Sequence, residues 1–185
     1  MVEGSREIEV KYRIADPVAA AEALSAAGFV LSPPIHQDDQ AYAEVGWQYG
    51  MSKVGVAFAR LRTVQGRYVF TVKKPIDNEM VCTEYECEVS DREQMHHAIM
   101  AMGFYPTVQI VKTRRTASRA ALSLCLDEVE RIGSFLEVER LVASHQSGLQ
   151  VQAELNEFVR SLGIAAERTT DTYDSLIRAA MQLSA

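Results

Sequence analysis

Five residues near the N-terminus, Glu7-Ile8-Glu9-Val10-Lys11, alternate strictly between charged and apolar side chains. A period of two is that of a β-strand, in which successive side chains point to opposite faces. The three charges therefore share one face, and the two carboxylates lie about 7 Å apart along it. Two carboxylates followed by an ammonium form half of a site for a divalent cation and a phosphate. A solvated strand face above an apolar core would show the same pattern.

The composition is that of an ordinary globular chain, with 185 residues, 48% of them hydrophobic, and a net charge of −6. We expect one domain over 1-185, because no linker or composition break divides the sequence. The acidic balance argues against general nucleic-acid binding. No apolar run approaches the ~20 residues of a membrane span, and no signal peptide is recognisable. We therefore expect a cytoplasmic protein without nucleic-acid or membrane partners.

The residues that most often bind zinc or carry out nucleophilic catalysis form no motif here. Three cysteines lack CxxC spacing, and we interpret them as reduced thiols: Cys82, Cys87 and Cys125. Two histidines are expected on a helix and two in loops, so none is assigned to catalysis or zinc: His96 and His97, then His36 and His145. No GxxxxGK[ST] segment is present, so a P-loop nucleotidase is unsupported.

Alternating patterns recur along the chain and predict seven further strands, at 37–45, 54–63, 67–73, 81–89, 107–116, 122–129 and 135–142. Gln65-Gly66 is typical of a hairpin turn. Helices are predicted at 18–27, 91–102, 149–162 and 173–183, the first after an Asp16-Pro17 cap and the second after Asp91. The glycine-containing segment 47–53 is predicted to be an irregular, mobile loop.

The sign of the charges is segregated by strand. Acidic residues lie on the first, fifth, seventh and eighth predicted strands, and basic residues on the third, fourth and sixth. An open antiparallel sheet with one wet face also alternates, but it has no need of such segregation. We therefore predict an α+β fold, a closed eight-stranded antiparallel β-barrel with a charged interior and helices packed outside. Its acidic half would hold a hard divalent cation and its basic half a polyanion.

These segments resemble, in order, the signature of the CYTH superfamily, the triphosphate tunnel metalloenzymes. That family includes class IV adenylyl cyclases, thiamine triphosphatases and inorganic tripolyphosphatases. The first strand matches its ExExK motif, and later strands are similar to its LRxR, TxKxP and KxRR motifs at Arg60-Leu61-Arg62, Thr71-Val72-Lys73-Lys74-Pro75 and Lys112-Thr113-Arg114-Arg115. The resemblance also covers Glu84-Tyr85-Glu86-Cys87-Glu88, one closing segment made of Leu126-Asp127-Glu128-Val129 followed by Gly133-Ser134-Phe135-Leu136-Glu137-Val138-Glu139, and Asp171-Thr172-Tyr173. The ExExK motif alone is a weak signal, but seven segments in the right order over nearly the whole chain are a strong one.

The resemblance implies a tunnel that binds a triphosphate with Mg²⁺ or Mn²⁺. Carried over by position, the metal residues would be Glu7, Glu9, Glu137 and Glu139, and the phosphate-binding residues Lys11, Arg60, Arg62, Lys73, Lys112 and Arg114. Glu7, Glu9 and Lys11 would carry the catalytic step. Glu84, Glu86 and Asp127 are second-tier candidates with two possible roles, which are to contact the metal or to orient the basic residues. An interstrand salt bridge is the alternative for each base, and the favoured interpretation for Arg67, Glu88 and Arg115. Family members are often dimers, which leaves a homodimer open.

The nucleophile decides which reaction such a tunnel performs. Water would make the protein a triphosphatase, whereas the ribose 3′-hydroxyl of ATP would make it a cyclase that releases cyclic AMP and pyrophosphate. The His-Phe pair that precedes ExExK in some bacterial cyclases is absent from 1–6. We therefore expect hydrolysis of a triphosphate, with adenylyl cyclase as the alternative and a non-catalytic polyphosphate- or nucleotide-binding module as a third hypothesis. Trp47 could stack on a substrate ring, although packing on the barrel rim is the favoured interpretation.

Overall fold

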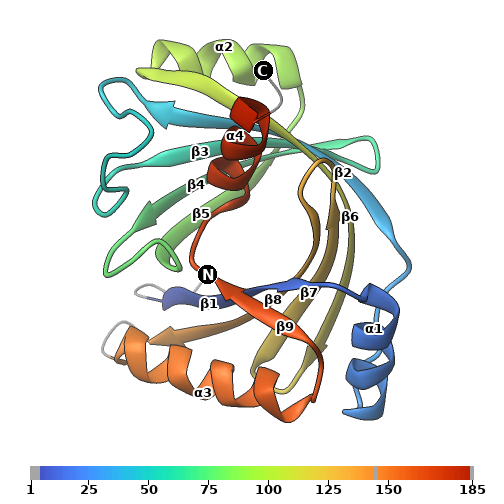
Figure 1. Cartoon of the computed structure of the whole chain (residues 1–185). Coiled ribbons are helices and arrows are strands. Elements are labelled where there is room, and N and C mark those ends of the chain that lie inside the picture. The colour runs from blue at the N-terminus through green and yellow to red at the C-terminus, as the bar shows by residue number, and fades with distance from the viewer. Residues whose placement is uncertain (1–4, 144–145, 184–185) are drawn as a thin grey trace.

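The computed structural model describes residues 5–143 and 146–183 and shows a closed antiparallel barrel with helices around it (Figure 1). The strands are β1 (Ser5–Ile14), β2 (Ile35–Glu44), β3 (Phe58–Val64), β4 (Arg67–Pro75), β5 (Val81–Val89), β6 (Phe104–Arg119), β7 (Leu122–Val129), β8 (Gly133–Ala143) and β9 (Ala166–Thr169). The helices are α1 (Pro17–Ala26), α2 (Arg92–Ala101), α3 (Gly148–Ser161) and α4 (Tyr173–Leu183).

Eight strands close the ring in the order β5-β4-β3-β2-β6-β7-β8-β1, and β1 pairs back to β5. That closing contact is short, with Glu7 opposite Cys82 and Ile8 opposite Val81. The predicted eight-stranded barrel is confirmed. The same edge of β1 continues past β5 and pairs with β9 at Lys11–Ile14. Strand β9 was not predicted, because four residues are too few to display a period.

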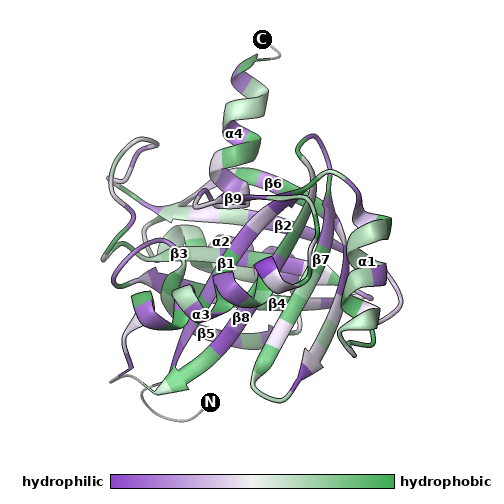
Figure 2. Ribbon diagram, turned by 60° about the horizontal axis from the view of Figure 1, so that its bottom comes forward, coloured by the Kyte–Doolittle hydropathy of each residue, from purple (hydrophilic) through white to green (hydrophobic). Residues whose placement is uncertain are grey.

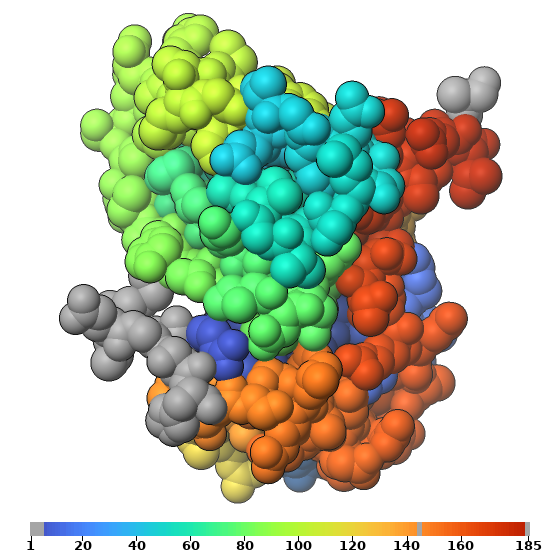
Figure 3. All heavy atoms as spheres, turned by 90° about the vertical axis from the view of Figure 1, so that its left-hand side faces the viewer, coloured from blue at the N-terminus to red at the C-terminus, as the bar shows by residue number. Residues whose placement is uncertain are grey.

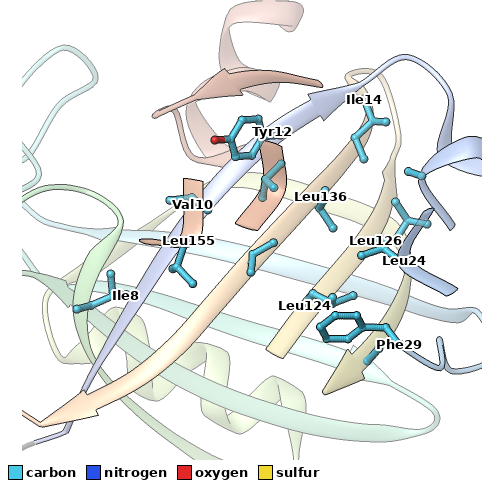
Figure 4. Close-up of a cluster of buried hydrophobic side chains, with 14 of the residues drawn as sticks. Ile8, Val10, Tyr12, Ile14, Leu24, Phe29, Leu124, Leu126, Leu136 and Leu155 are labelled. Atoms are coloured by element: carbon cyan, nitrogen blue, oxygen red, sulfur yellow. The ribbon is translucent and has the colours of Figure 1, made fainter. Parts of the chain in front are cut away.

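The alternation of β1 separates two environments, as predicted. Its apolar residues point outward into a core shared with β7, β8, α1 and α3 (Figure 4). Ile8 and Val10 are at most 1% exposed there, next to Leu155 of α3. The charged residues of β1 consequently point into the barrel. A one-residue slip would exchange the two faces, so burial of the apolar face fixes the register.

Local signals in the sequence place the first two helices and the hairpin. The Asp16 carboxylate accepts hydrogen bonds from the backbone N–H groups of Val18 and Ala19, and Asp91 accepts one from Gln94. Both aspartates therefore cap a helix as predicted. Gln65 and Gly66 adopt φ values of 50° and 74°, which suit the tight turn between β3 and β4.

Helix α4 differs from the other three, which lie on the outside of the barrel. Its first residue, Tyr173, is 6% exposed and packs against Phe135 of β8 with ring centroids 5.1 Å apart. Ile177, one turn later, joins the same apolar cluster. The rest of α4 projects from one end of the barrel (Figure 2). The predicted barrel with helices packed around it is confirmed, and the first residue of α4 lies against the barrel interior at that end.

Two details of the sequence prediction need correction, and a third lies outside the described residues. The third strand begins at Phe58 and not at residue 54, because Gly55 turns the chain with φ +82° and donates its N–H to the Pro75 carbonyl. His36 lies in β2 and not in a loop, while His145 lies outside the described residues. Segment 47–53 is irregular, as predicted, and the irregular stretch is longer than predicted, running over 45–57. No helix in the described parts of the chain is long and apolar enough to cross a membrane.

Candidate metal and phosphate site

The barrel encloses a cavity of about 370 Å³ with a strongly charged lining. Six basic side chains line it, and they are the six predicted from the sequence: Lys11, Arg60, Arg62, Lys73, Lys112 and Arg114. Nine acidic side chains face them: Glu7, Glu9, Asp39, Glu79, Glu84, Glu86, Glu137, Glu139 and Asp174. This excess of acid would repel a polyanion unless bound cations compensated it.

Three of the four predicted metal residues come together. Oxygen atoms of Glu7, Glu9 and Glu139, here called the acidic cluster, all lie within 4.8 Å of one another. The pairing of β1 with β8 causes this proximity, because it sets Glu9 opposite Glu139. Side chains at directly opposed positions of an antiparallel pair are neighbours on the same face. The acidic cluster is therefore a direct consequence of strand register.

The charges of the acidic cluster are poorly compensated. Burial, together with the charges of Glu137 and Glu7, raises the pKa of Glu9 to about 7. Burial and the charges of Glu7 and Glu9 likewise raise the pKa of Glu139 to about 7. Burial acts in the same direction on Glu7, but its ion pair with Lys73, 2.8 Å away, keeps the pKa of Glu7 below its usual value. Carboxylates gathered in this way favour a bound cation.

Glu137, the fourth predicted metal residue, is held by bases. Its carboxylate lies 2.5 Å from Arg114 and 3.3 Å from Lys11, and Lys11 is its register partner on β1. Burial alone would raise the pKa of Glu137, but these cations lower it well below its usual value. Glu137 lines the same cavity. It does not belong to the acidic cluster that the described carboxylates form.

The opposite side of the cavity is built from paired charges: Asp39, Arg62, Lys112, Arg114 and Asp127, here called the paired wall. Asp39 accepts two hydrogen bonds from Arg62, at 2.7 and 2.8 Å. Burial opposes ionisation of Asp39, but this bidentate contact outweighs it and lowers the pKa of Asp39 to about 2. Asp39 and Arg62 are register partners, so the interstrand ion pair considered as an alternative does form.

Asp127 is the hub of the paired wall. Its side chain is fully buried, and it accepts hydrogen bonds from Arg114 at 2.7 and 2.5 Å and from Lys112 at 3.4 Å. Of the two roles left open for Asp127, orientation of the bases agrees with this geometry. Burial and the charge of Arg114 lower the pKa of Lys112 to about 8.

Tyr173 connects the paired wall to β1, and sequence reasoning gave it no role in the site. Its hydroxyl donates to Asp127 at 2.9 Å. Its ring lies 4.3 Å from the ammonium of Lys11 and 5.0 Å from that of Lys112, both distances being to the ring centroid. Two cation–π contacts on one ring fix the positions of two lysines. The signal in the sequence was the resemblance of Asp171-Thr172-Tyr173 to the family pattern, which gave Tyr173 no specific role.

Lys73 and Arg60 stand between the two regions. Lys73 bridges Glu7 at 2.8 Å and Glu84 at 2.6 Å, while Arg60 lies 3.1 Å from Glu86. Glu84 and Glu86 therefore both contact bases, and Glu84 also forms a side-chain hydrogen bond with Glu7 of the acidic cluster. These ion pairs do not prevent phosphate binding, because an ammonium or guanidinium can reorient one of its donors.

Lys53 was missed because it stands in the irregular segment, outside any repeat. It is 6% exposed, and its ammonium contacts Thr172 and Ser175 at 2.7 Å and Glu79 at 3.1 Å. Lys53 therefore ties segment 45–57 to the start of α4 and to the turn before β5. Figure 3 shows segment 45–57 (cyan) and α4 (red) next to each other on one face of the molecule.

The residues that we expected outside the site are outside it. Arg67 and Glu88 pair with each other on the surface at 3.6 Å, and Arg115 donates to the Ser32 carbonyl. Trp47 packs edge-on against Phe58 and donates its indole N–H to the Ser52 carbonyl. This agrees with the packing interpretation of Trp47.

The cysteines are all free thiols. Burial raises the pKa of both Cys82 and Cys125 to about 12, so neither thiol ionises readily. None of the three belongs to the described side chains that could gather around a metal ion.

The family model of the CYTH domain matches residues 5–173. The chain belongs to the CYTH family. Its CYTH match spans every strand of the barrel, all three residues of the acidic cluster and the paired wall. CYTH proteins form the triphosphate tunnel metalloenzyme superfamily, and their use of divalent metal ions fits the three gathered carboxylates.

Individual relatives share the fold at low sequence identity. A protein of Methanocaldococcus jannaschii named "Putative adenylate cyclase" is 25% identical over 163 residues, which are 87% of this chain and 91% of that protein. The structure of a Pyrococcus horikoshii protein has a TM-score of 0.77 at 23% identity, covering 94% of this chain and 98% of that one. A Hippeastrum protein reported to reveal a dominant triphosphatase activity has a TM-score of 0.61 at 20% identity, covering 94% and 95%.

Proposed function

We propose that this CYTH protein is a divalent-metal-dependent hydrolase that acts on a triphosphate bound inside the barrel. The observation that carries the proposal is the acidic cluster facing a row of bases across one cavity. Hard cations such as Mg²⁺ and Mn²⁺ prefer carboxylate oxygens, and phosphates prefer Arg and Lys. Because the lining carries more acidic than basic side chains, phosphate binding depends on a bound cation that compensates the excess negative charge.

Each group of residues has a separate task in this proposal. Glu7, Glu9 and Glu139 would hold the cation, which would supply charge neutralisation and Lewis-acid activation at the phosphoryl group. Glu137 either completes that set or positions Lys11 and Arg114, its present partners. The six lining bases bind the phosphate oxygens. Preorganised charges of this kind would stabilise the charge that develops on the leaving group.

The reaction itself is a transfer of the terminal phosphoryl group to water. The oxygen of water forms a bond to the phosphorus, the bond to the bridging oxygen breaks, and a diphosphate leaves. Lys73 and Arg60 lie beside the acidic cluster through Glu7 and Glu84. Both bases are therefore placed near the phosphoryl group that is transferred, while the paired wall binds the remaining phosphates.

Cyclisation of ATP is the second candidate. The name of the Methanocaldococcus jannaschii relative favours it, whereas the activity named for the Hippeastrum relative favours hydrolysis. The absence of a His-Phe pair before Glu7 supports hydrolysis as the leading proposal.

Product analysis separates the candidates. The purified protein is incubated with ATP, tripolyphosphate or thiamine triphosphate, each with Mg²⁺ or Mn²⁺, and the products are identified by phosphorus NMR. We expect orthophosphate and a diphosphate, and no reaction in EDTA. Cyclic AMP with pyrophosphate would replace the hydrolase by a cyclase. Metal-dependent binding without any product would leave a binding module.

A further inference from the structure

The shortest strand pairing of the barrel lies beside the acidic cluster. Strand β1 pairs with β5 only at Glu7 and Ile8, and β9 takes over the same edge of β1 from Lys11 onward. In the described part of the chain no strand pairs with that edge at Glu9 and Val10. We call this place, residues 7–10 of β1 and the facing residues 78–82, the seam. Glu9, a member of the acidic cluster, therefore lies in a gap of the sheet.

Two hydrogen bonds satisfy the Glu9 backbone in this gap. Its N–H donates to the Met80 carbonyl at 3.0 Å, and its carbonyl accepts from the side-chain amide of Gln152 in α3 at 3.1 Å. Gln152 is 5% exposed, so the bond is made away from water. A buried carbonyl without a donor is costly. Gln152 thus supplies the hydrogen bond that a neighbouring strand supplies elsewhere in the barrel.

Gln152 also holds the other side of the seam. Its amide oxygen accepts from the Asn78 amide at 3.2 Å, and the Asn78 oxygen accepts from the Met80 N–H at 2.9 Å. Met80 is the residue whose carbonyl meets Glu9. One buried side chain therefore uses its donor on β1 and its acceptor on the turn before β5, and it fixes the two sides relative to each other.

Helix α3 comes close to the seam because its first residue is a glycine. A Cβ at Gly148 would lie 3.1 Å from the side chain of Val81 and 3.2 Å from the carboxylate of Asp77, which is tighter than ordinary van der Waals contact. Farther along α3, Leu155 joins Val10 in the outer core (Figure 4). The helix is thus pressed onto the seam on both sides of Gln152.

We propose that Gln152 is a positioning residue of the metal site, which fixes the main chain at Glu9 and thereby the spacing of the acidic cluster. This inference rests on the proposed metal site and adds to it a residue outside the barrel. Strand β8, which carries Glu139, pairs with β1 over all of Ser5–Ile14. The side of Glu9 that lacks a strand is therefore the side on which its position depends on Gln152.

The spacing of carboxylates decides which ion a site prefers. Mg²⁺ requires near-octahedral oxygen ligands at about 2.0–2.1 Å, whereas Ca²⁺ accepts irregular sets at about 2.3–2.6 Å. A site with fixed spacing can favour the smaller ion, and a loosened site loses that preference. A contribution of Gln152 to stability alone would leave the preference unchanged. Ion selectivity therefore separates positioning from a merely structural role.

The test compares Gln152→Leu, which removes the amide at similar size, with Gln150→Leu on the exposed face of the same helix. Mn²⁺ binding to the triphosphate-free protein is followed by electron paramagnetic resonance, and Mg²⁺ and Ca²⁺ affinities are obtained by competition. We expect Gln152→Leu to weaken Mg²⁺ at least fivefold and to leave Ca²⁺ within twofold. Partners bonded directly to a ligand side chain typically contribute about 10- to 100-fold, and Gln152 acts through the main chain.

The control and the wild type make each outcome decisive. Gln150→Leu should bind all three ions as the wild type does. An unchanged Mg²⁺ affinity in Gln152→Leu, or equal losses for Mg²⁺ and Ca²⁺, would overturn the positioning role alone. A wild-type protein that binds no Mn²⁺ would overturn the proposed metal site together with this inference.

Gly148→Ala keeps the inference testable if Gln152→Leu does not fold. It retains the amide, and the added methyl group displaces α3 from Val81 by a few tenths of an ångström. We expect the same loss of preference for Mg²⁺ over Ca²⁺, measured by the same competition. Wild-type selectivity in a folded Gly148→Ala protein would overturn the claim that α3 sets the spacing of the acidic cluster.

Discussion

On one side of the cavity each buried carboxylate has a cation beside it, whereas on the other side three carboxylates face one another. Asp39 and Asp127 of the paired wall contact Arg62, Arg114 and Lys112 at 2.5 to 3.4 Å. Among the described residues, the bases that form ion pairs with the acidic cluster are Lys73 and, at 3.8 Å from Glu9, Lys11. The pKa values follow, with Asp39 lowered to about 2 and Glu9 and Glu139 raised to about 7.

This difference separates the charges that stabilise the fold from the charges that favour binding of a ligand. Removing one partner of a buried ion pair leaves an uncompensated charge and is costly. Removing one member of a group of like charges relieves repulsion. The same kind of substitution should therefore lower stability in the paired wall and lower activity, but not stability, in the acidic cluster.

Glu9→Gln should give the largest effect and break the acidic cluster. We expect turnover to fall on the order of 10³-fold, because several kcal/mol of metal-derived stabilisation are lost. The melting temperature of the metal-free protein should stay equal or rise, since one of three facing charges is gone. Assays with Mg²⁺ and thermal melts in EDTA check both outcomes. Glu88→Gln, on the exposed surface, is the matched control. Wild-type turnover in Glu9→Gln would contradict the assignment.

Asp39→Asn should show the reverse behaviour in the paired wall. We expect a loss of about 3–5 kcal/mol in the free energy of unfolding, because Arg62 is left buried and unpaired. The pKa of Asp39 lies below its ordinary value of 3.8, so its stabilisation is complete above about pH 4. It is lost as the pH falls towards 2. Denaturant melts should show the two proteins converging over that range, and a constant difference would refute the ion pair.

Lys73→Ala tests the residue that joins the two regions. We expect KM for the triphosphate to rise about 10- to 100-fold, since a charge-assisted hydrogen bond contributes about 1.5–3 kcal/mol. Steady-state kinetics measure this, and kcat should change less than KM. The neighbouring Lys74 points to solvent, so Lys74→Ala serves as the control. An unchanged KM in Lys73→Ala would remove that residue from the site.

Tyr173→Phe should give the smallest effect. It removes the hydroxyl that donates to Asp127 but keeps the ring between Lys11 and Lys112. We expect a loss of about 1 kcal/mol in stability, measured by denaturant melts, because Asp127 keeps its other donors. Turnover should remain close to that of the wild type. Tyr173→Leu, which also removes the ring, should have a higher KM than Tyr173→Phe. Equal kinetics for the two variants would show that the ring does not position the lysines.

The barrel and the inward orientation of its charged side chains could be predicted, because a period of two is visible within each single strand. Ile8 and Val10 against Glu7 and Glu9 is such a pattern, and burial of the apolar face enforces it. Strand β9 and the start of β3 escaped prediction, since one has four residues and the other depends on the turn at Gly55.

The site could be predicted only as far as strand faces allow. All the residues assigned to metal and phosphate do line one cavity. Which charges pair depends on register and on segments far apart in sequence. Glu137 contacts Arg114 from β6 and not the acidic cluster, and Lys53 reaches α4 from a segment without a period. Periodicity within a strand carries no information about such contacts.

The most direct test of this contrast is a titration of Mn²⁺ into the triphosphate-free protein, followed by electron paramagnetic resonance. The account predicts that the wild-type protein binds Mn²⁺ and that Glu139→Gln weakens its affinity at least tenfold. Glu88→Gln, whose carboxylate lies on the surface, should bind Mn²⁺ as the wild type does. Equal Mn²⁺ affinity in the wild type and in Glu139→Gln would contradict the assignment of the acidic cluster as the metal site.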